Sequence, residues 1–171
     1  MNKVKMIAAF FLCALMTYAC GYRFAGSGEL PDNIERIFIE VFENSTSKAG
    51  IERVVTNQLV FEFTRKRKRS LASDATNADA TLKGVIKKIR TRTISRVGTG
   101  VARDREVIMS MDLRLINQIG DVICSAKALS DRQAYDVSDS KLENDRNDSL
   151  AIALLSERIS ERIFSRLTDN F

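Results

Sequence analysis

Residues 107–115 read VIMSMDLRL, and an apolar side chain occupies every second position of this stretch. A two-residue period is typical of a β-strand that buries one face, and at ~3.4 Å per residue the stretch extends over about 30 Å. The apolar side chains belong to Val107, Met109, Met111, Leu113 and Leu115, and the side chains of Ser110, Asp112 and Arg114 point to the other face. The stretch therefore predicts a long, half-buried strand.

The neighbouring stretches extend this strand into a meander. Residues 80–94 alternate in the same way, with one break that indicates a β-bulge. Residues 117–121, NQIGD, predict a hairpin turn, after which residues 122–129 return as the next strand. The connection between the first two strands, residues 95–103, contains two glycines, and we expect it to form an exposed, mobile loop.

A further strand and a helix precede the meander. Residues 36–42, RIFIEVF, are rich in β-branched and aromatic side chains and favour a strand that is covered on both faces or lies inside the sheet. Residues 49–64 have a helical period of apolar side chains. Val60 and Phe61 lie outside that apolar stripe, so we expect the rest of the domain or a partner to cover them.

A second helix ends the chain. Residues 138–148 are polar and supply cap oxygens, and an apolar stripe from Ile152 to Leu167 follows them. The element order is therefore strand, helix, three strands, helix. This order predicts an α+β fold, in which two helices pack on one face of a mostly antiparallel four-stranded sheet.

The N-terminus has the layout of a secretory signal. Lys3 and Lys5 precede an uncharged apolar stretch at residues 6–16, and Ala19 stands directly before Cys20. As a helix at ~1.5 Å per residue, the apolar stretch would be about 17 Å long, which is too short for a hydrocarbon core of ~30 Å. The pair Ala19-Cys20 resembles the bacterial lipobox, in which the cysteine is acylated and the chain is cut just before it.

We therefore divide the chain into a signal peptide at residues 1–19, a lipid-anchored tether at 20–33 and a single α+β domain at 34–171. The expected lipid anchor is Cys20. The alternative is an ordinary secretory signal that is cut elsewhere, in which case Cys20 is incidental.

Composition argues against catalysis and metal binding. The chain has no histidine and three cysteines, so the commonest zinc ligands and proton carriers are absent or few. Cys124 is expected to be a small buried hydrophobe within a strand. The carboxylates that flank the strands are expected to be solvated; they are Asp104, Glu106, Asp131 and Asp136. We expect no enzyme, no cofactor and no metal.

Five consecutive cations, Arg65 to Arg69, follow the first predicted helix. One interpretation is a solvated cap, because cations complement the negative end of the helix dipole and bond its last carbonyl groups. The other interpretation is an anion-binding patch, to which each cation contributes ~1 kcal/mol near an anionic lipid surface. The sequence leaves both interpretations open.

These elements, in this order behind Cys20-Gly21-Tyr22, resemble the lipopolysaccharide-assembly lipoprotein (LptE) family. The family opens with cysteine, glycine and an aromatic residue, and a nearby proline, here Pro31, leads into its first strand. Its first helix has its counterpart in residues 53–59, and its loop and third strand have theirs in residues 98–115. The resemblance spans nearly the whole chain after Cys20.

The resemblance implies an outer-membrane lipoprotein on the periplasmic side that binds lipopolysaccharide and plugs a β-barrel partner. The lipoprotein and the barrel together would move lipopolysaccharide to the outer leaflet. It also implies two lipopolysaccharide-binding residues, Arg96 in the loop between strands and Lys141 in the polar segment before the last helix. A nucleic-acid partner is not expected for an exported protein. The competing interpretation is another periplasmic lipoprotein module, such as a pilotin or a secretion-channel subunit.

Overall fold

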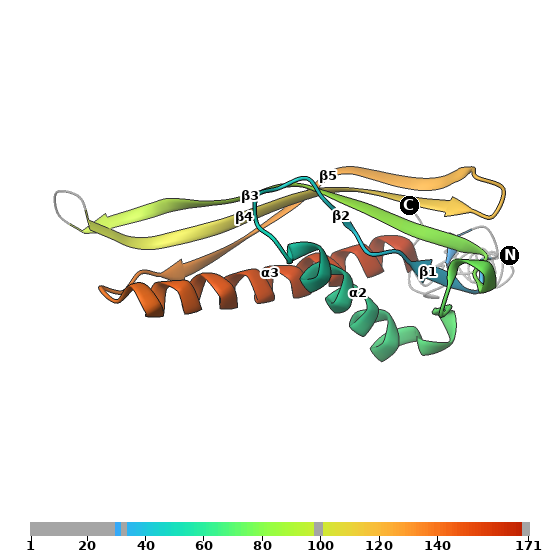
Figure 1. Ribbon diagram of the computed structural model, residues 1–171, viewed down its shortest axis with the longest axis horizontal. Coiled ribbons are helices and arrows are strands. Elements are labelled where there is room, and N and C mark those ends of the chain that lie inside the picture. Colours follow the sequence, from blue (N-terminus) through green and yellow to red (C-terminus); the bar gives the residue numbers. More distant parts are fainter. Residues whose placement is uncertain (1–29, 32–33, 98–100, 169–171) are drawn as a thin grey trace, which may run out of the picture.

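A long, twisted sheet carries both helices on one face (Figure 1). The computed structural model describes residues 30–31, 34–97 and 101–168. Along the chain the elements are β1 (Ile37–Ile39), β2 (Glu43–Asn44), α2 (Ile51–Arg67), η2 (Lys68–Ser70), η3 (Ala75–Asn77), β3 (Ala80–Val97), β4 (Val101–Asn117), β5 (Val122–Asp136) and α3 (Lys141–Thr168). The predicted α+β fold is confirmed, with a sheet of five strands instead of four.

The meander β3-β4-β5 forms most of the sheet, as the alternating pattern predicts. Both strand pairs are antiparallel, and Leu115 on β4 lies opposite Leu82 on β3 and Cys124 on β5. The register of β3 shifts between Ile86 and Lys88, which confirms the predicted bulge. The predicted turn at residues 117–121 is also present, and the Asn117 backbone N–H donates to the Asp121 carbonyl oxygen over 2.9 Å.

The first predicted strand is divided in two and lies at the edge of the sheet. β1 and β2 pair in parallel with β3, with Ile39 opposite Leu82 and Glu43 opposite Val85. The segment between β1 and β2 therefore has one residue more than the segment it faces on β3. Val41 points outward and is 61% exposed. The prediction of a strand covered on both faces is wrong, because only one face of this edge segment packs against the core.

The helices bury their apolar stripes against the sheet and against each other. The Phe63 ring on α2 meets the Phe164 ring on α3 edge to face, with 4.8 Å between their centroids. The central side chains are fully buried; they are Leu59, Phe63, Leu82, Ile86, Met109, Met111, Leu115, Leu155, Ile159 and Ile163. Within the described chain nothing covers Phe61, which is 58% exposed.

Helix α3 begins earlier than the sequence predicts. Residues 141–148 were expected to lead into the helix, but they form its first two turns. Ser140 precedes the first residue, and its hydroxyl oxygen accepts the Glu143 backbone N–H over 3.4 Å. The Ser138 backbone N–H donates to the Asn144 side-chain oxygen over 2.8 Å. These bonds satisfy backbone groups where the helix starts, so apolar contacts are not needed there.

Candidate functional site

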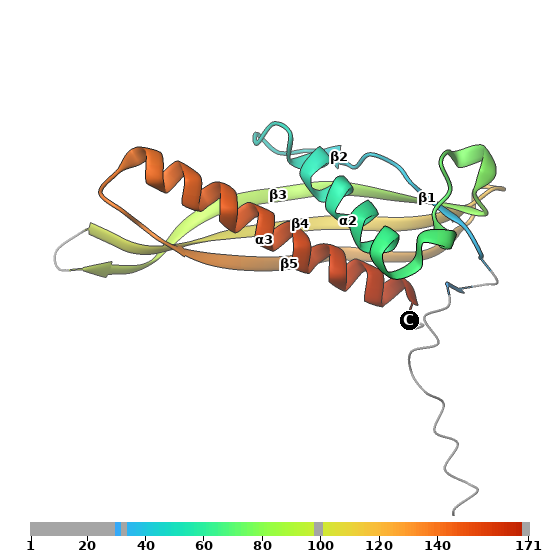
Figure 2. The ribbon, with the colours of Figure 1, turned by 90° about the horizontal axis from the view of Figure 1, so that it is seen from below.

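The two residues singled out for binding lie at the same end of the molecule. Arg96 is on β3, where its backbone pairs with Ala102 of β4 next to the hairpin tip. The Arg103 carbonyl oxygen accepts the backbone N–H of Val137, which lies just before α3. The tip of β3 and β4 and the start of α3 therefore share one end of the sheet, the hairpin end (Figures 1 and 2).

Both residues belong to regular structure, which corrects the sequence prediction. Arg96 was expected in a loop of residues 95–103, but β3 continues to Val97 and β4 starts at Val101. Residues 98–100 lie outside the described residues. Lys141 was expected before the last helix, but it is the first residue of α3. Its side chain is 91% exposed, and its ammonium lies 3.3 Å from the Asp145 carboxylate. This weak surface pair leaves Lys141 accessible.

One carboxylate, that of Asp148 on α3, connects strands β3 and β5 to the helix layer. The Thr91 hydroxyl of β3 donates to Asp148 over 3.2 Å, and the Tyr135 hydroxyl of β5 donates over 3.3 Å. The Lys48 ammonium lies 2.7 Å from the same carboxylate. Four segments of the chain thus meet at Asp148, and this contact fixes the position of the hairpin end relative to α3.

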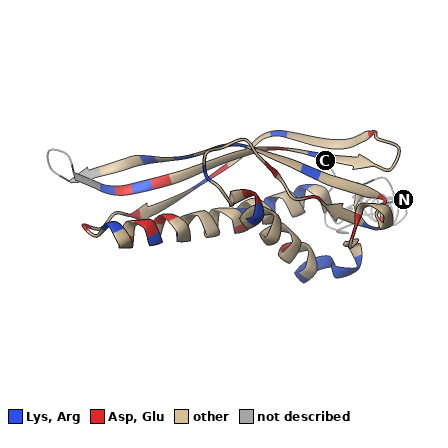
Figure 3. Cartoon of the chain, viewed as in Figure 1, with Lys and Arg blue, Asp and Glu red and all other residues tan. Residues whose placement is uncertain are grey.

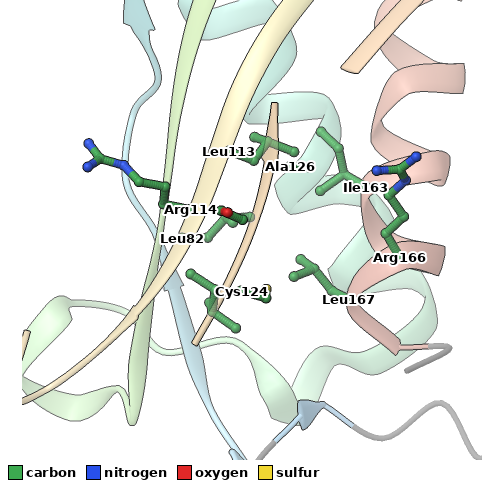
Figure 4. Close-up of a pocket in the computed structure, with 10 residues that line it drawn as sticks. Leu82, Leu113, Arg114, Cys124, Ala126, Ile163, Arg166 and Leu167 are labelled. Atoms are coloured by element: carbon green, nitrogen blue, oxygen red, sulfur yellow. The ribbon is translucent and has the colours of Figure 1, made fainter. Parts of the chain in front are cut away.

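The sheet face opposite the helices, here called the helix-free face, is rich in cations. The Arg114 side chain extends from β4 away from Ile163 and Leu167 of α3 (Figure 4). An open hollow of about 380 Å³ on this face is lined by the cations Lys83, Lys87, Arg114 and Lys127 and by the acid Asp112. Further along the sheet, Arg90, Arg92 and Arg132 line a second depression, to which Asp131 of β5 and Arg162 of α3 also contribute.

Few of these cations are neutralised. The Arg92 guanidinium pairs with the Glu106 carboxylate, and the Lys83 ammonium lies 3.1 Å from the Glu40 carboxylate. Among the described residues, no carboxylate pairs with Lys87, Lys88, Arg90, Arg114, Lys127 or Arg132. The sequence predicted Arg96 and Lys141 as lipopolysaccharide-binding residues and left the Arg65–Arg69 run open as an anion-binding patch. The missed cations occupy the outward positions of strands that alternate clearly, so strand phase could have identified them.

Two of the acids of the strands lie on opposite faces of the sheet. Glu106 is buried beside Arg92, whereas Asp131 faces α3 and lies 3.2 Å from the Arg162 guanidinium. The prediction that these carboxylates are solvated is wrong for both residues. Among the described residues, no group of three or more Cys, Asp and Glu side chains could hold a metal.

The run Arg65 to Arg69 divides into two parts. Arg65 and Lys66 lie in the last turn of α2 and pair with Glu62, whose side chain is buried. Burial would raise the Glu62 pKa, but hydrogen bonds and positive charge from Lys66 and Arg65 outweigh it and hold that pKa below its ordinary value. These two cations are therefore structural. Figure 3 shows that the positive run continues past the end of α2.

The interior offers no ligand cavity near the end of α3. A hollow of about 10 Å³ lies between β5 and α3, with Cys124, Ala126, Ile163 and Leu167 among its lining residues (Figure 4). That volume is close to the minimum for one water molecule. Cys124 is half-buried against the core there. No described helix is long and apolar enough to cross a membrane. The candidate surfaces are therefore on the outside of the domain.

The fold is shared with small lipoprotein domains from several bacteria. Lipoprotein B from Nitrosomonas europaea superposes with a TM-score of 0.61 at 15% identity, covering 82% of this chain and 85% of that one. Rare lipoprotein B from Shewanella oneidensis gives 0.51 at 16% identity, covering 74% and 89%. A minor lipoprotein from Acinetobacter baumannii gives 0.52 at 12% identity, covering 78% and 91%. At these identities the likeness establishes a common fold class and nothing more.

The family is established by sequence. The model of the LptE family, described as lipopolysaccharide-assembly, matches residues 34–167. No curated protein matches the chain in sequence. Because the family match runs from before β1 to Leu167 of α3, the chain belongs to the lipopolysaccharide-assembly (LptE) family, as the resemblance of its sequence predicted.

Proposed function

We propose that this chain is an outer-membrane lipoprotein, anchored through Cys20, that binds lipopolysaccharide and plugs a β-barrel partner during lipopolysaccharide transport to the outer leaflet. The observation that carries the proposal is the match to the lipopolysaccharide-assembly family over residues 34–167. The domain has a cation-rich outer surface and only a water-sized hollow between β5 and α3, which is consistent with binding to large partners. Its role is binding and positioning, without chemistry on the glycolipid.

The lipopolysaccharide site of the proposal is the hairpin end. The fold brings Arg96 and Lys141 to this end although they are far apart in sequence. Lipopolysaccharide carries phosphate groups, and an arginine fork binds phosphate oxygens in a directed way, whereas lysine acts as a point charge. The unpaired cations of the helix-free face, such as Arg90 and Arg132, extend positive charge from this end along the sheet.

The barrel-facing surface of the proposal is the helix-free face. The lumen of an outer-membrane barrel is polar, so a plug needs a charged surface that stays hydrated inside it. The hollow lined by Lys83, Arg114, Lys127 and Asp112 has this mixed but mainly positive character. A photo-crosslinking residue at Arg114 or Lys127 should trap a much larger membrane protein. Crosslinking only to a second copy of this chain would instead support a homo-oligomeric periplasmic module.

The anchor is tested separately. Cys20 lies outside the described residues, and the proposal rests on the signal-like sequence that precedes it. Cells labelled with a radioactive fatty acid should incorporate label into the natural chain and not into Cys20→Ala. Equal labelling of both chains would contradict the anchor.

A further inference from the structure

Three arginines from two separate segments line one hollow at the end of the sheet remote from the hairpin end. The hollow has a volume of about 550 Å³, and its lining residues are Leu30, Ile34, Glu35, Arg36, Arg67, Arg69 and Ser70. We call it the arginine hollow. It lies where the chain enters the domain, because Leu30 is the first described residue. Glu35 is the one carboxylate among the lining residues.

The backbone on both sides of the arginine hollow is held in place. The Asp79 carboxylate accepts the backbone N–H groups of Glu35 and Arg36 over 3.0 Å and 2.8 Å. Next to them, Ile37 bridges to Leu71, and the Ile37 carbonyl oxygen accepts the Ala72 backbone N–H over 2.8 Å. The segment that follows α2 is thereby fixed beside β1. These backbone contacts hold Arg36, Arg67 and Arg69 near one another.

The charge of these arginines is not balanced within the described chain. None of their three guanidinium groups forms a hydrogen bond or ion pair with a described residue, in contrast to Arg65 and Lys66 on the neighbouring Glu62. One nitrogen of Arg67, Nη1, is buried and has no hydrogen-bond partner there. A buried N–H group without a partner is costly, and a guanidinium fork matches the oxygens of a phosphate. The arginine hollow is thus suited to an anion with several oxygens.

The position of the arginine hollow indicates where such an anion comes from. Leu30 is ten positions after Cys20, and an extended chain covers at most ~3.3–3.6 Å per position, so the hollow stays within about 36 Å of the anchor. We propose that the arginine hollow binds the phosphate of an anionic phospholipid in the leaflet that holds the acyl chains of Cys20. This inference rests on the Cys20 anchor of the proposed function, but it does not depend on lipopolysaccharide binding.

The consequence would be a fixed orientation. β3 runs from Ala80, beside β1, to Val97 at the hairpin tip, and at ~3.4 Å per residue this strand spans about 60 Å. With the arginine hollow on the phospholipid surface, the hairpin end would point away from that contact. The two ends of one sheet would then bind two different lipids, a membrane phospholipid at the tether and lipopolysaccharide at the tip.

The test compares two triple variants of the full, acylated chain in uncharged detergent. The pocket variant is Arg36→Gln, Arg67→Gln and Arg69→Gln. The control variant, Arg53→Gln, Arg146→Gln and Arg166→Gln, removes the same charge from three exposed arginines that pair with no described carboxylate. Short-chain phosphatidylglycerol, short-chain phosphatidylcholine and inorganic phosphate are titrated in turn by calorimetry, and thermal unfolding confirms that each variant folds.

Phosphatidylglycerol should bind the natural chain and the control variant equally and the pocket variant at least about tenfold more weakly, because each lost cation near an anionic lipid weakens binding about fivefold. Phosphatidylcholine should bind more weakly than phosphatidylglycerol. Equal phosphatidylglycerol affinity in the pocket and control variants would overturn the site. Inorganic phosphate that binds as tightly as phosphatidylglycerol would overturn the lipid as its ligand. The pocket variant should bind lipopolysaccharide as the natural chain does. Its loss of phosphatidylglycerol binding can therefore be distinguished from a failure of the proposed lipopolysaccharide binding.

Discussion

Replacing Gly84 with alanine should destabilise the domain through a direct clash in the core. Gly84 lies on the helix-facing side of β3, where an added Cβ would come within 2.6 Å of two ring carbons of Phe42 and 2.7 Å of a third. Carbon atoms in contact normally sit ~3.5–4.0 Å apart. The extra residue between β1 and β2 brings the Phe42 ring over β3, and the absence of a side chain at Gly84 makes room for it.

The ring has little freedom to withdraw. Phe42 is 2% exposed, and its backbone N–H donates to the Thr56 hydroxyl over 3.0 Å. That hydroxyl in turn donates to the Glu52 carbonyl oxygen over 2.7 Å, which ties the segment to α2. Overpacking of a filled core costs ~1–3 kcal/mol, and the fixed backbone places this site in the upper half, about 2–3 kcal/mol. For a domain of this size such a loss lowers Tm by roughly 5–10 °C.

Urea and thermal unfolding of four chains would measure this effect: the natural chain, Gly84→Ala, Phe42→Leu and the double variant. The leucine side chain lacks the ring, so Gly84→Ala should cost much less in the Phe42→Leu background than in the natural one. The same cost in both backgrounds would show that the clash with Phe42 is not the cause. A Gly84→Ala chain as stable as the natural one would refute the packing argument altogether.

Two further substitutions test the contacts around the arginine run and the arginine hollow. Glu62→Gln should lower the free energy of unfolding at pH 7 by about 1–2 kcal/mol. The folded pKa of Glu62 lies below its unfolded value of about 4.5, so this stabilisation is complete above that unfolded pKa and is lost as pH falls through the folded pKa. The urea midpoints of the natural chain and of Glu62→Gln should therefore converge as the pH is lowered. A difference between them that stays constant from pH 6 to pH 3 would contradict this. Asp79→Ala removes the acceptor of two backbone N–H groups and should lower the free energy of unfolding in urea by about 1 kcal/mol. Asp79→Asn keeps one acceptor oxygen and should cost less. Equal costs for the two variants would contradict a stabilising role for these two hydrogen bonds.

The central meander could be predicted because its first two strands, β3 and β4, each bury one face. The alternation of Met109, Met111 and Leu113 with polar residues is a local signal that needs no knowledge of the partner strand. The far half of β5 lacks this signal. There Asp131 takes an inward position, and Arg162 of α3 binds both its carboxylate and the Ser130 carbonyl oxygen. Polar contacts across layers replace apolar ones, so the strand was predicted to end at Leu129 instead of Asp136.

The start of α3 and the edge strands were missed for related reasons. The first two turns of α3 extend beyond the apolar core, so residues 141–148 carry no stripe to reveal a helix. β1 and β2 pair in parallel with a strand that lies beyond α2 in sequence, and a short apolar run does not indicate such a non-local pairing. The arginine hollow could not be predicted either, because no local pattern indicates that Arg36 lies near Arg67, which is 31 positions later in the chain.

The most direct test of the proposed function is lipopolysaccharide binding by the double variant Arg96→Asp and Lys141→Asp. Purified lipopolysaccharide is titrated against the natural chain and the variant at low and moderate salt, with thermal unfolding and co-purification of the barrel partner measured in parallel. Aspartate at position 141 would face Asp145 one turn on, but the positive N-terminal end of α3 favours a carboxylate there, and each of these effects is worth only a few tenths to ~1 kcal/mol. The melting temperature and the barrel complex should therefore persist. The account predicts that the variant keeps both and loses lipopolysaccharide binding; unchanged binding by the variant would contradict it.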